Sequence, residues 1–189
     1  MKKVSKPITS VIMLVLVAVA VYGLWVAKMG RNEASDAKKE VEKAAITSQD
    51  KIIKFETQAV VSLLAELNNK AQKGELTKTQ AKKMGADLIR QMRYGNDNKG
   101  YFFVDTGAGV NVVLYGNKDV EGKNRIKDSI KGVNYVEEII KKAKSGGGFT
   151  DYWYPKITGG EPMAKRAYSM YFEPFDWSVG TGYYLDEVK

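Results

Sequence analysis

The side chains best suited to bind a small polar molecule are concentrated in the second half of this 189-residue chain. Tyrosines dominate there, with a few lysines and arginines among them. A hydrophobic core more often uses Leu, Ile and Phe, because a buried phenol needs a hydrogen-bond partner. Tyrosine hydroxyls and a cation can together donate to an anion, which predicts a small polar pocket, although tyrosine is also common on half-exposed strands. The aromatic residues are Tyr101, Phe102, Phe103, Tyr115, Phe149, Tyr152, Trp153, Tyr154, Tyr168, Tyr171, Phe172, Trp177, Tyr183 and Tyr184.

Two missing residue types limit the chemistry that the chain could perform. The sequence contains neither Cys nor His, which removes thiol nucleophiles, imidazole bases, disulfides and zinc-finger spacing. It also lacks a nucleophile elbow and a Walker loop. We therefore expect no enzyme: no catalytic residues, no bound metal and no cofactor.

The positive charge of the chain does not indicate a nucleic-acid-binding protein. The formal net charge is +8, and four of these charges are Lys2, Lys3, Lys6 and Lys28, in a segment without acidic residues. Further along, lysines and arginines are mixed with acidic residues, which is typical of a solvated surface. Nucleic acid is accordingly not expected as a partner.

An apolar run near the N-terminus predicts a membrane anchor. It extends over twenty residues from Ile8 to Ala27 without a charge, and a helix of that length covers roughly the 30 Å hydrocarbon core. A cleaved signal peptide is the alternative, but the run is longer than the usual ~7–15-residue apolar region, and no A-x-A site follows before Lys28. The expected organisation is a basic cytoplasmic head (1–7), a single-pass signal-anchor in the inner membrane (8–28), and a domain in the periplasm or outside the cell (29–189).

Two helices are predicted after the anchor. Small and apolar residues recur every three or four positions from Ala34 to Leu63, which predicts a long helix reaching about Ala71 and ending at 73–74. Because its early stripe consists of alanines, it could lie on its own domain or form a dimer seam with a second copy. A capping box at 77–80 begins a second helix with a stripe that we expect to be buried, formed by Ala81, Met84, Leu88 and Met92.

From residue 101 the apolar period changes from helical to two, which indicates strands. An inserted helix follows Asn134, which lies three residues before Glu137 in a capping pattern. Two helices followed by strands with one inserted helix predict an antiparallel sheet that is covered on one face by helices. The predicted strands are 101–104, 110–115, 149–154, 164–172 and 177–184.

Several short motifs occur in a fixed order along the second half of the chain. They are RYGND at 93–97, GYFFVD at 100–105, GKN at 122–124, GGF at 147–149, YWYPK at 152–156, KRAY at 165–168 and FDWSVGTGYYLD at 175–186. Each motif is weak alone, but the ordered set is specific. From about residue 33 to 188 the chain resembles a single Cache (sCache) domain, the extracytoplasmic sensor domain of methyl-accepting chemotaxis receptors and sensor histidine kinases.

The resemblance implies an α+β fold in which a long N-terminal helix packs on a PAS-like five-stranded antiparallel sheet. It also implies a pocket for small ligands, often short carboxylates such as acetate, propionate, pyruvate or lactate. Arg93 or Lys165 would pair with the carboxylate, and tyrosine hydroxyls would donate to it. The ligand-binding residues carried over from the family are Arg93, Tyr101, Phe103, Tyr152, Tyr154, Lys165 and Tyr168.

The sequence departs from the family pattern at the pocket. Leu114 and Tyr115 stand where the family commonly has His-Pro, and Tyr154 stands where Trp is usual. Strand alternation also places Lys165 and Tyr168 on opposite faces, unless their strand begins late or bulges.

Two functions follow as hypotheses. The first is a membrane-anchored sensor domain that binds a short organic acid for chemotaxis or signal transduction. The second is an accessory or structural membrane subunit that assembles through its long N-terminal helix, as a homodimer or with another membrane protein, and uses the Cache fold as a scaffold. Since the sequence ends at Lys189, we expect the signalling module to be a separate protein or a segment missing from the sequence.

Overall fold

The computed structural model describes the backbone of residues 6–95 and 97–188, with side chains from residue 19 onward. It confirms the α+β class, with a long N-terminal helix followed by a five-stranded antiparallel sheet. The elements are α1 (Lys6–Gln72), α2 (Lys78–Gln91), β1 (Phe102–Thr106), β2 (Asn111–Leu114), α3 (Tyr135–Lys144), β3 (Gly148–Pro155), β4 (Pro162–Phe172) and β5 (Trp177–Tyr184), with short 3-10 helices η1 (Lys118–Val120), η2 (Glu173–Phe175) and η3 (Leu185–Glu187).

The chain divides after Ala44 into two units. Within the first unit, the described side chains of α1 are exposed up to residue 44. No helix of the described residues is apolar and long enough to cross a membrane. The first part of the expected anchor, residues 8–18, lies outside the residues whose side chains are described. The anchor and the boundaries at residues 7 and 28 therefore stay predictions.

The second unit is built on the antiparallel sheet, in which the strand order is β2-β1-β5-β4-β3. The pairing of β4 with β5 runs without a break from Lys165 opposite Tyr184 to Phe172 opposite Trp177. Because side chains alternate along a strand, this unbroken register assigns each residue of β4 to one face of the sheet.

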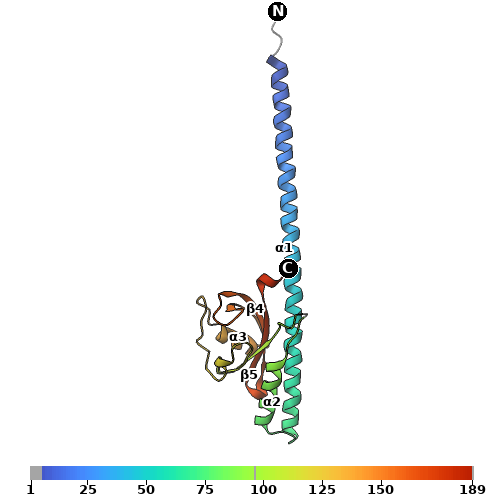
Figure 1. The fold of residues 1–189 in the computed structure, drawn as a ribbon. Coiled ribbons are helices and arrows are strands. Elements are labelled where there is room, and N and C mark those ends of the chain that lie inside the picture. The colour runs from blue at the N-terminus through green and yellow to red at the C-terminus, as the bar shows by residue number, and fades with distance from the viewer. Residues whose placement is uncertain (1–5, 96, 189) are drawn as a thin grey trace, which may run out of the picture. The chain divides into compact units, whose positions relative to one another are not determined.

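Helices cover both faces of the sheet, which corrects the expectation of one covered face. On one face, α1 and α2 share a hydrophobic cluster with β1, β2 and β5. On the other face, α3 packs on β3 and β4, and the Ser169 hydroxyl donates to the Ile139 carbonyl of α3 at 3.1 Å. Figure 1 shows α3 across the sheet from α2 and the C-terminal part of α1. The inserted helix was correctly predicted, but the strand order that sends it to the far face was not visible in the sequence.

Polar contacts add to the packing of α1 on β4. Arg166 of β4 donates to both carboxylate oxygens of Asp50 on α1, at 2.8 and 3.1 Å, and to those of Asp151 on β3, at 2.8 and 2.7 Å. The Tyr183 hydroxyl donates to the same Asp50 at 2.9 Å. Bidentate pairs of this kind fix geometry as well as contributing energy, so α1 is held in register with β4 and β5.

The contact between α1 and α2 depends on small residues. Gly85 of α2 faces Leu64 of α1 so closely that a Cβ atom at Gly85 would lie 2.7 Å from the Leu64 side chain. Ala81, Gly85, Ala86 and Ile89 form the buried side of α2. The predicted stripe is therefore wrong at two positions, since Met84 and Leu88 are 44% and 41% exposed. Close helix approach selects the small residues for the interface, and the larger apolar ones lie outside it.

Two helix ends follow the local sequence signals, whereas the capping pattern predicted at Asn134 is wrong, because the Asn134 side chain forms no cap hydrogen bond at the start of α3. Thr77 caps α2, accepting from the Gln80 backbone at 3.2 Å while the Gln80 side chain accepts from the Thr77 backbone at 2.8 Å. This is the predicted capping box. After α1, Gly74 has a left-handed backbone with φ of 78°, as expected for a glycine that ends a helix.

We predict that Leu64→Ala destabilises this fold far more than Leu63→Ala. Leu64 is fully buried in the cluster between α1, α2 and the sheet, whereas its neighbour Leu63 is only half-buried. Removal of a buried Leu side chain leaves a cavity and costs about 3 kcal/mol, whereas the partly exposed position should cost less than about 1 kcal/mol. Urea unfolding of both variants, followed by circular dichroism, measures the two changes. Equal destabilisation would contradict this packing of α1.

Candidate functional site

A small cavity lies between the sheet and α3. Its free volume is about 20 Å³, about enough for one water molecule, so a larger ligand needs the side chains around it to separate. Most of the lining is aromatic or aliphatic, with four charged or amide side chains. The lining residues are Tyr101, Phe103, Asp105, Asn111, Leu114, Arg125, Tyr135, Val136, Ile139, Tyr152, Tyr154 and Lys165.

Lys165 is the central charge of the cavity. It is only 2% exposed, and its ammonium group donates to the Tyr101 hydroxyl at 2.6 Å. Its nitrogen also lies over three aromatic rings, 4.5 Å from that of Tyr101, 5.5 Å from that of Tyr154 and 4.9 Å from that of Tyr184. In the described part of the chain, no carboxylate forms an ion pair with it. A buried cation that is stabilised only by ring faces and one hydroxyl strongly attracts an anion.

The phenols of Tyr152 and Tyr154 remain protonated at neutral pH, because each has a pKa above its ordinary value. Burial raises the pKa of Tyr152 well above its ordinary value, and the neighbouring phenols raise it further. Burial also raises the pKa of Tyr154, against the lowering effect of Arg125. A protonated phenol can donate to a carboxylate. The cavity therefore combines one cation with several neutral donors.

Backbone geometry leaves room for the aromatic floor of the cavity. Phe103 of β1 lies opposite Gly180 of β5, and a Cβ atom at Gly180 would lie 2.5 Å from the Phe103 ring. A side chain at this position would collide with the ring, so the close approach of Phe103 to β5 requires glycine. On the helix side, Tyr135 of α3 stacks on Tyr152 with ring centroids 5.3 Å apart.

Five of the seven predicted site residues line this cavity: Tyr101, Phe103, Tyr152, Tyr154 and Lys165. The other two lie elsewhere. Arg93 stacks its guanidinium 3.4 Å from the ring of Tyr115 and donates to the main-chain oxygens of two residues just before it, Arg90 and Met92.

Tyr168 faces α1, where it packs with Ile53 and Tyr183. The regular register of β4 explains this position, because three residues separate Tyr168 from Lys165 and the strand does not bulge between them. Five of the predicted residues thus share one cavity, and a ligand-binding role for any of the seven stays a prediction.

Sequence reasoning missed several polar residues of the cavity. Asp105 follows Phe103 by two positions on β1, so strand alternation alone could have placed it on the same face. Arg125 lies in the irregular connection after β2, where no periodicity shows its direction. It is nearly buried, donates to Asp128 at 2.9 Å and also donates to the Tyr135 hydroxyl.

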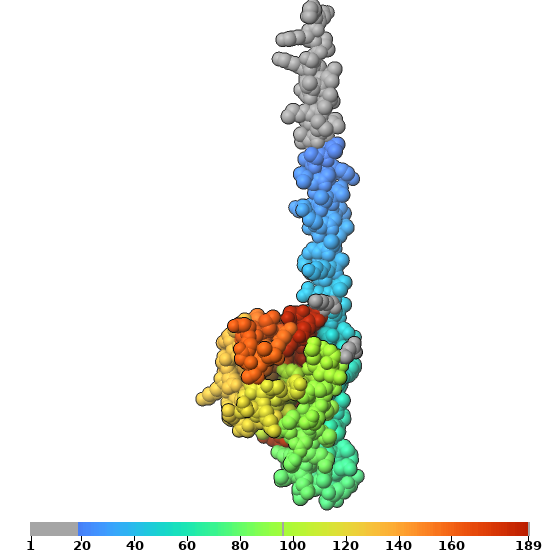
Figure 2. Space-filling model, in the orientation of Figure 1, coloured from blue at the N-terminus to red at the C-terminus, as the bar shows by residue number. Residues whose placement is uncertain are grey.

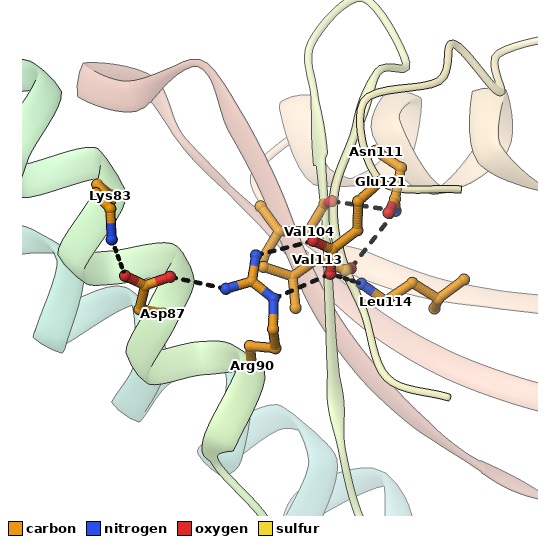
Figure 3. A network of polar contacts seen from close by, with 8 residues as sticks. All are labelled: Lys83, Asp87, Arg90, Val104, Asn111, Val113, Leu114 and Glu121. Atoms are coloured by element: carbon orange, nitrogen blue, oxygen red, sulfur yellow. Dashed lines mark hydrogen bonds and ion pairs between the residues drawn. The ribbon is translucent and has the colours of Figure 1, made fainter. Parts of the chain in front are cut away.

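An ion-pair network supports the β2 wall of the cavity, and Figure 3 shows its members. Arg90 of α2 donates to both oxygens of Glu121, at 3.1 and 2.9 Å. Glu121 in turn accepts a longer bond, 3.4 Å, from the backbone of Leu114, which lines the cavity. Lys83 and Asp87 extend the network along the surface of α2. The position of this wall is thus tied to α2.

A surface groove adjoins the cavity and shares Tyr101 and Tyr154 with it. Its rim includes the turn between β3 and β4 and the end of β2, where the Thr158 hydroxyl donates to the Gly116 carbonyl at 3.0 Å. Figure 2 shows this turn (orange) next to the segment that follows β2 (yellow).

We predict that Asp105→Asn stabilises the protein above pH 6 and has little effect at pH 4. Burial raises the pKa of Asp105 to about 6, while the Asn111 hydrogen bond and the charge of Arg125 lower it and Asp128 raises it. Because this pKa lies above the unfolded value of 3.8, the folded state binds the proton more tightly. The resulting stabilisation is present below about pH 4 and is lost as pH rises to 6.

At pH 7.5 we expect the free energy of unfolding of the variant to exceed that of the unmodified chain by up to about 3 kcal/mol. Thermal unfolding of both proteins across this pH range measures the difference. A gain that is the same at pH 4 and pH 7.5 would show that the carboxylate charge is not its cause.

Comparison with characterised proteins relates this fold to sensors. The chain is 25% identical over 135 residues to the methyl-accepting chemotaxis protein McpP of Pseudomonas putida, an alignment that covers 70% of this chain and 24% of that protein. It is 34% identical over 109 residues to the sensor histidine kinase MctS of Rhizobium johnstonii, covering 57% and 23%. The chain thus spans about a quarter of the length of these curated relatives.

A solved structure has the same fold. It is a Cache chemosensory domain studied for its carboxylic acid recognition, with a TM-score of 0.69 and 24% identity, over 75% of this chain and 97% of that one. This likeness supports the arrangement of helices and sheet described above.

The family match covers the whole second unit. Residues 45–189 match the family described as Single Cache domain 2, and the motifs that carry the resemblance lie within this range. Cache domains of chemoreceptors are non-enzymatic ligand-binding domains, in keeping with the residues that line the cavity. The chain therefore belongs to the Single Cache domain 2 family.

Proposed function

We propose that this Cache domain is an extracytoplasmic sensor, anchored in the inner membrane, and that its cavity binds a short organic carboxylate. Lys165 carries the proposal, because it is a buried cation without a carboxylate partner among the described residues. The ligand's carboxylate would accept from Lys165 and from the phenols of Tyr101, Tyr152 and Tyr154. Its alkyl part would lie against the apolar lining of Phe103, Leu114, Val136 and Ile139.

The relatives support a role in signalling. One is a chemotaxis protein and another is a sensor histidine kinase, and the related Cache structure was studied for recognition of carboxylic acids. The apolar run from Ile8 to Ala27 would provide the anchor. Since the relatives are about four times as long as the matched region, the output would be performed by a further module of the same or another protein.

We predict that Lys165→Met weakens binding of propionate or pyruvate at least about tenfold, because it removes the only charge that we assign to the carboxylate. Methionine fills a similar volume, and replacement of a buried charge by an apolar group need not destabilise the fold. Isothermal titration of the full chain in detergent measures the affinity, and thermal unfolding verifies the fold.

Arg93→Gln and Tyr168→Phe are the matched controls, since both residues lie away from the cavity. Both should retain the affinity of the unmodified chain within about twofold. If Arg93→Gln abolishes binding and Lys165→Met does not, the carboxylate binds at Arg93 instead. If no short acid binds the unmodified chain, the carboxylate-sensor proposal fails.

A second candidate role is assembly through α1, as a homodimer or with another membrane protein. One side of α1 in the second unit packs on the sheet through Ile53 and Leu64. Another side exposes Ile52, Phe55 and Ala59 at three- and four-residue spacing, with Phe55 64% exposed. Such spacing is typical of a seam between two helices. We therefore include pairing with a second copy of the chain in the proposal.

We predict that Phe55→Glu decreases self-association at least about tenfold, because a charge would be buried in the seam. Ile157→Glu is the matched control, since Ile157 is 74% exposed at the turn between β3 and β4. Sedimentation equilibrium in density-matched detergent gives the association constants of both variants and of the unmodified chain. If the unmodified chain stays monomeric, or if the two variants have equal association constants, the seam is contradicted.

A further inference from the structure

Three polar side chains form a buried row under α3. Asp105 of β1 lies opposite Asn111 of β2 on one side and opposite Ser178 of β5 on the other. Cross-strand partners share a face of the sheet, so the three side chains are neighbours. Their exposures are 3%, 1% and 0%. Asp105 and Asn111 also line the cavity that contains Lys165.

The row has unused hydrogen-bonding capacity. The Asn111 amide nitrogen donates to the Asp105 carboxylate at 2.9 Å and to the Val104 carbonyl at 3.3 Å, and Figure 3 shows the second of these bonds. Since these partners can only accept, the amide orientation is fixed. Among the described residues, no donor then reaches the Asn111 side-chain oxygen. The Ser178 hydroxyl likewise has no hydrogen-bond partner among them. A buried polar atom left in this state costs about 1–3 kcal/mol.

Asp105 has spare capacity as well. In the described part of the chain its carboxylate accepts a single side-chain hydrogen bond, from Asn111, although an ionised carboxylate can accept about four. Arg125 donates instead to Asp128 and to the Tyr135 hydroxyl. The row therefore offers acceptors, a carboxylate and an amide oxygen, to a donor that enters the cavity.

Lys165 and this row lie at different ends of the cavity. On β5, Lys165 is opposite Tyr184 and Asp105 is opposite Ser178. Six residues of strand correspond to roughly 20 Å at the backbone, and the side chains converge from there on the cavity. A two-carbon acid held at Lys165 would leave the row unreached.

We propose that the ligand has two polar ends, a carboxylate at Lys165 and a hydrogen-bond donor, hydroxyl or ammonium, at Asp105 and Asn111. This inference rests on the proposed function and specifies its ligand class as hydroxy- or amino-carboxylates substituted at the far end of the chain. A second carboxylate in that position would face Asp105 and be repelled. An ordered water could satisfy the same acceptors, but it would give no preference for a particular terminal group on the ligand.

Titration calorimetry on the full chain in detergent tests the inference with two series of acids. One consists of butyrate, 4-hydroxybutyrate, 4-aminobutyrate and succinate, and the other of hexanoate, 6-hydroxyhexanoate, 6-aminohexanoate and adipate. In at least one series, the hydroxy or amino acid should bind at least about tenfold more tightly than the unsubstituted acid, and the diacid should bind more weakly than either.

Asp105→Asn should decrease this preference to within about twofold while butyrate or hexanoate still binds. Asp128→Asn is the matched control, because Asp128 pairs with Arg125 and lies outside the cavity lining, and it should retain the preference. If unsubstituted acids bind as tightly as substituted ones, this inference is overturned and the carboxylate sensor stands. A preference that persists in Asp105→Asn overturns it equally, and if no acid of either series binds, both proposals fail.

Discussion

The unbroken pairing of β4 with β5 is the constraint on which the rest of this structure depends. It sends Lys165 toward α3 and Arg166, the next residue, toward α1. A one-residue slip would exchange the two faces along the whole strand. The register is held from both sides, by the pair between Arg166 and Asp50 and by the bond from Ser169 to α3. Both the lining of the cavity and the position at which α1 packs on the sheet follow from this one register.

Local sequence signals predicted the elements of the fold well. The capping box at Thr77, the glycine end of α1 and the five strands were all correct, because each is set by residues close in sequence. The buried side of α2 was wrong at Met84 and Leu88, since close approach to Leu64 favours small residues over larger apolar ones. Helices on both faces could not be predicted either, because strand order is determined by tertiary packing.

The cavity was predictable to the extent that it lies on regular strands. The family motifs and strand alternation pointed to five residues that the structure brings together: Tyr101, Phe103, Tyr152, Tyr154 and Lys165. Arg125 was missed because the connection after β2 has no period. Asp105 was missed although alternation with Phe103 pointed to it. Its carboxylate, the Arg125 guanidinium and the Lys165 ammonium are all costly to bury, so the cavity retains three charges that a purely structural core would replace with apolar residues.

The adjacency of Lys165 and Arg166 has a mechanical consequence. One side chain lines the cavity, and the other holds Asp50 of α1 through two hydrogen bonds. Only a single peptide unit separates them, and it is held by ladder bonds on both edges of β4. A displacement of the backbone at Lys165 would therefore be transmitted to α1 as movement of the strand. In this arrangement the hydrogen-bonded sheet would move as a rigid element, and α1 would move with it.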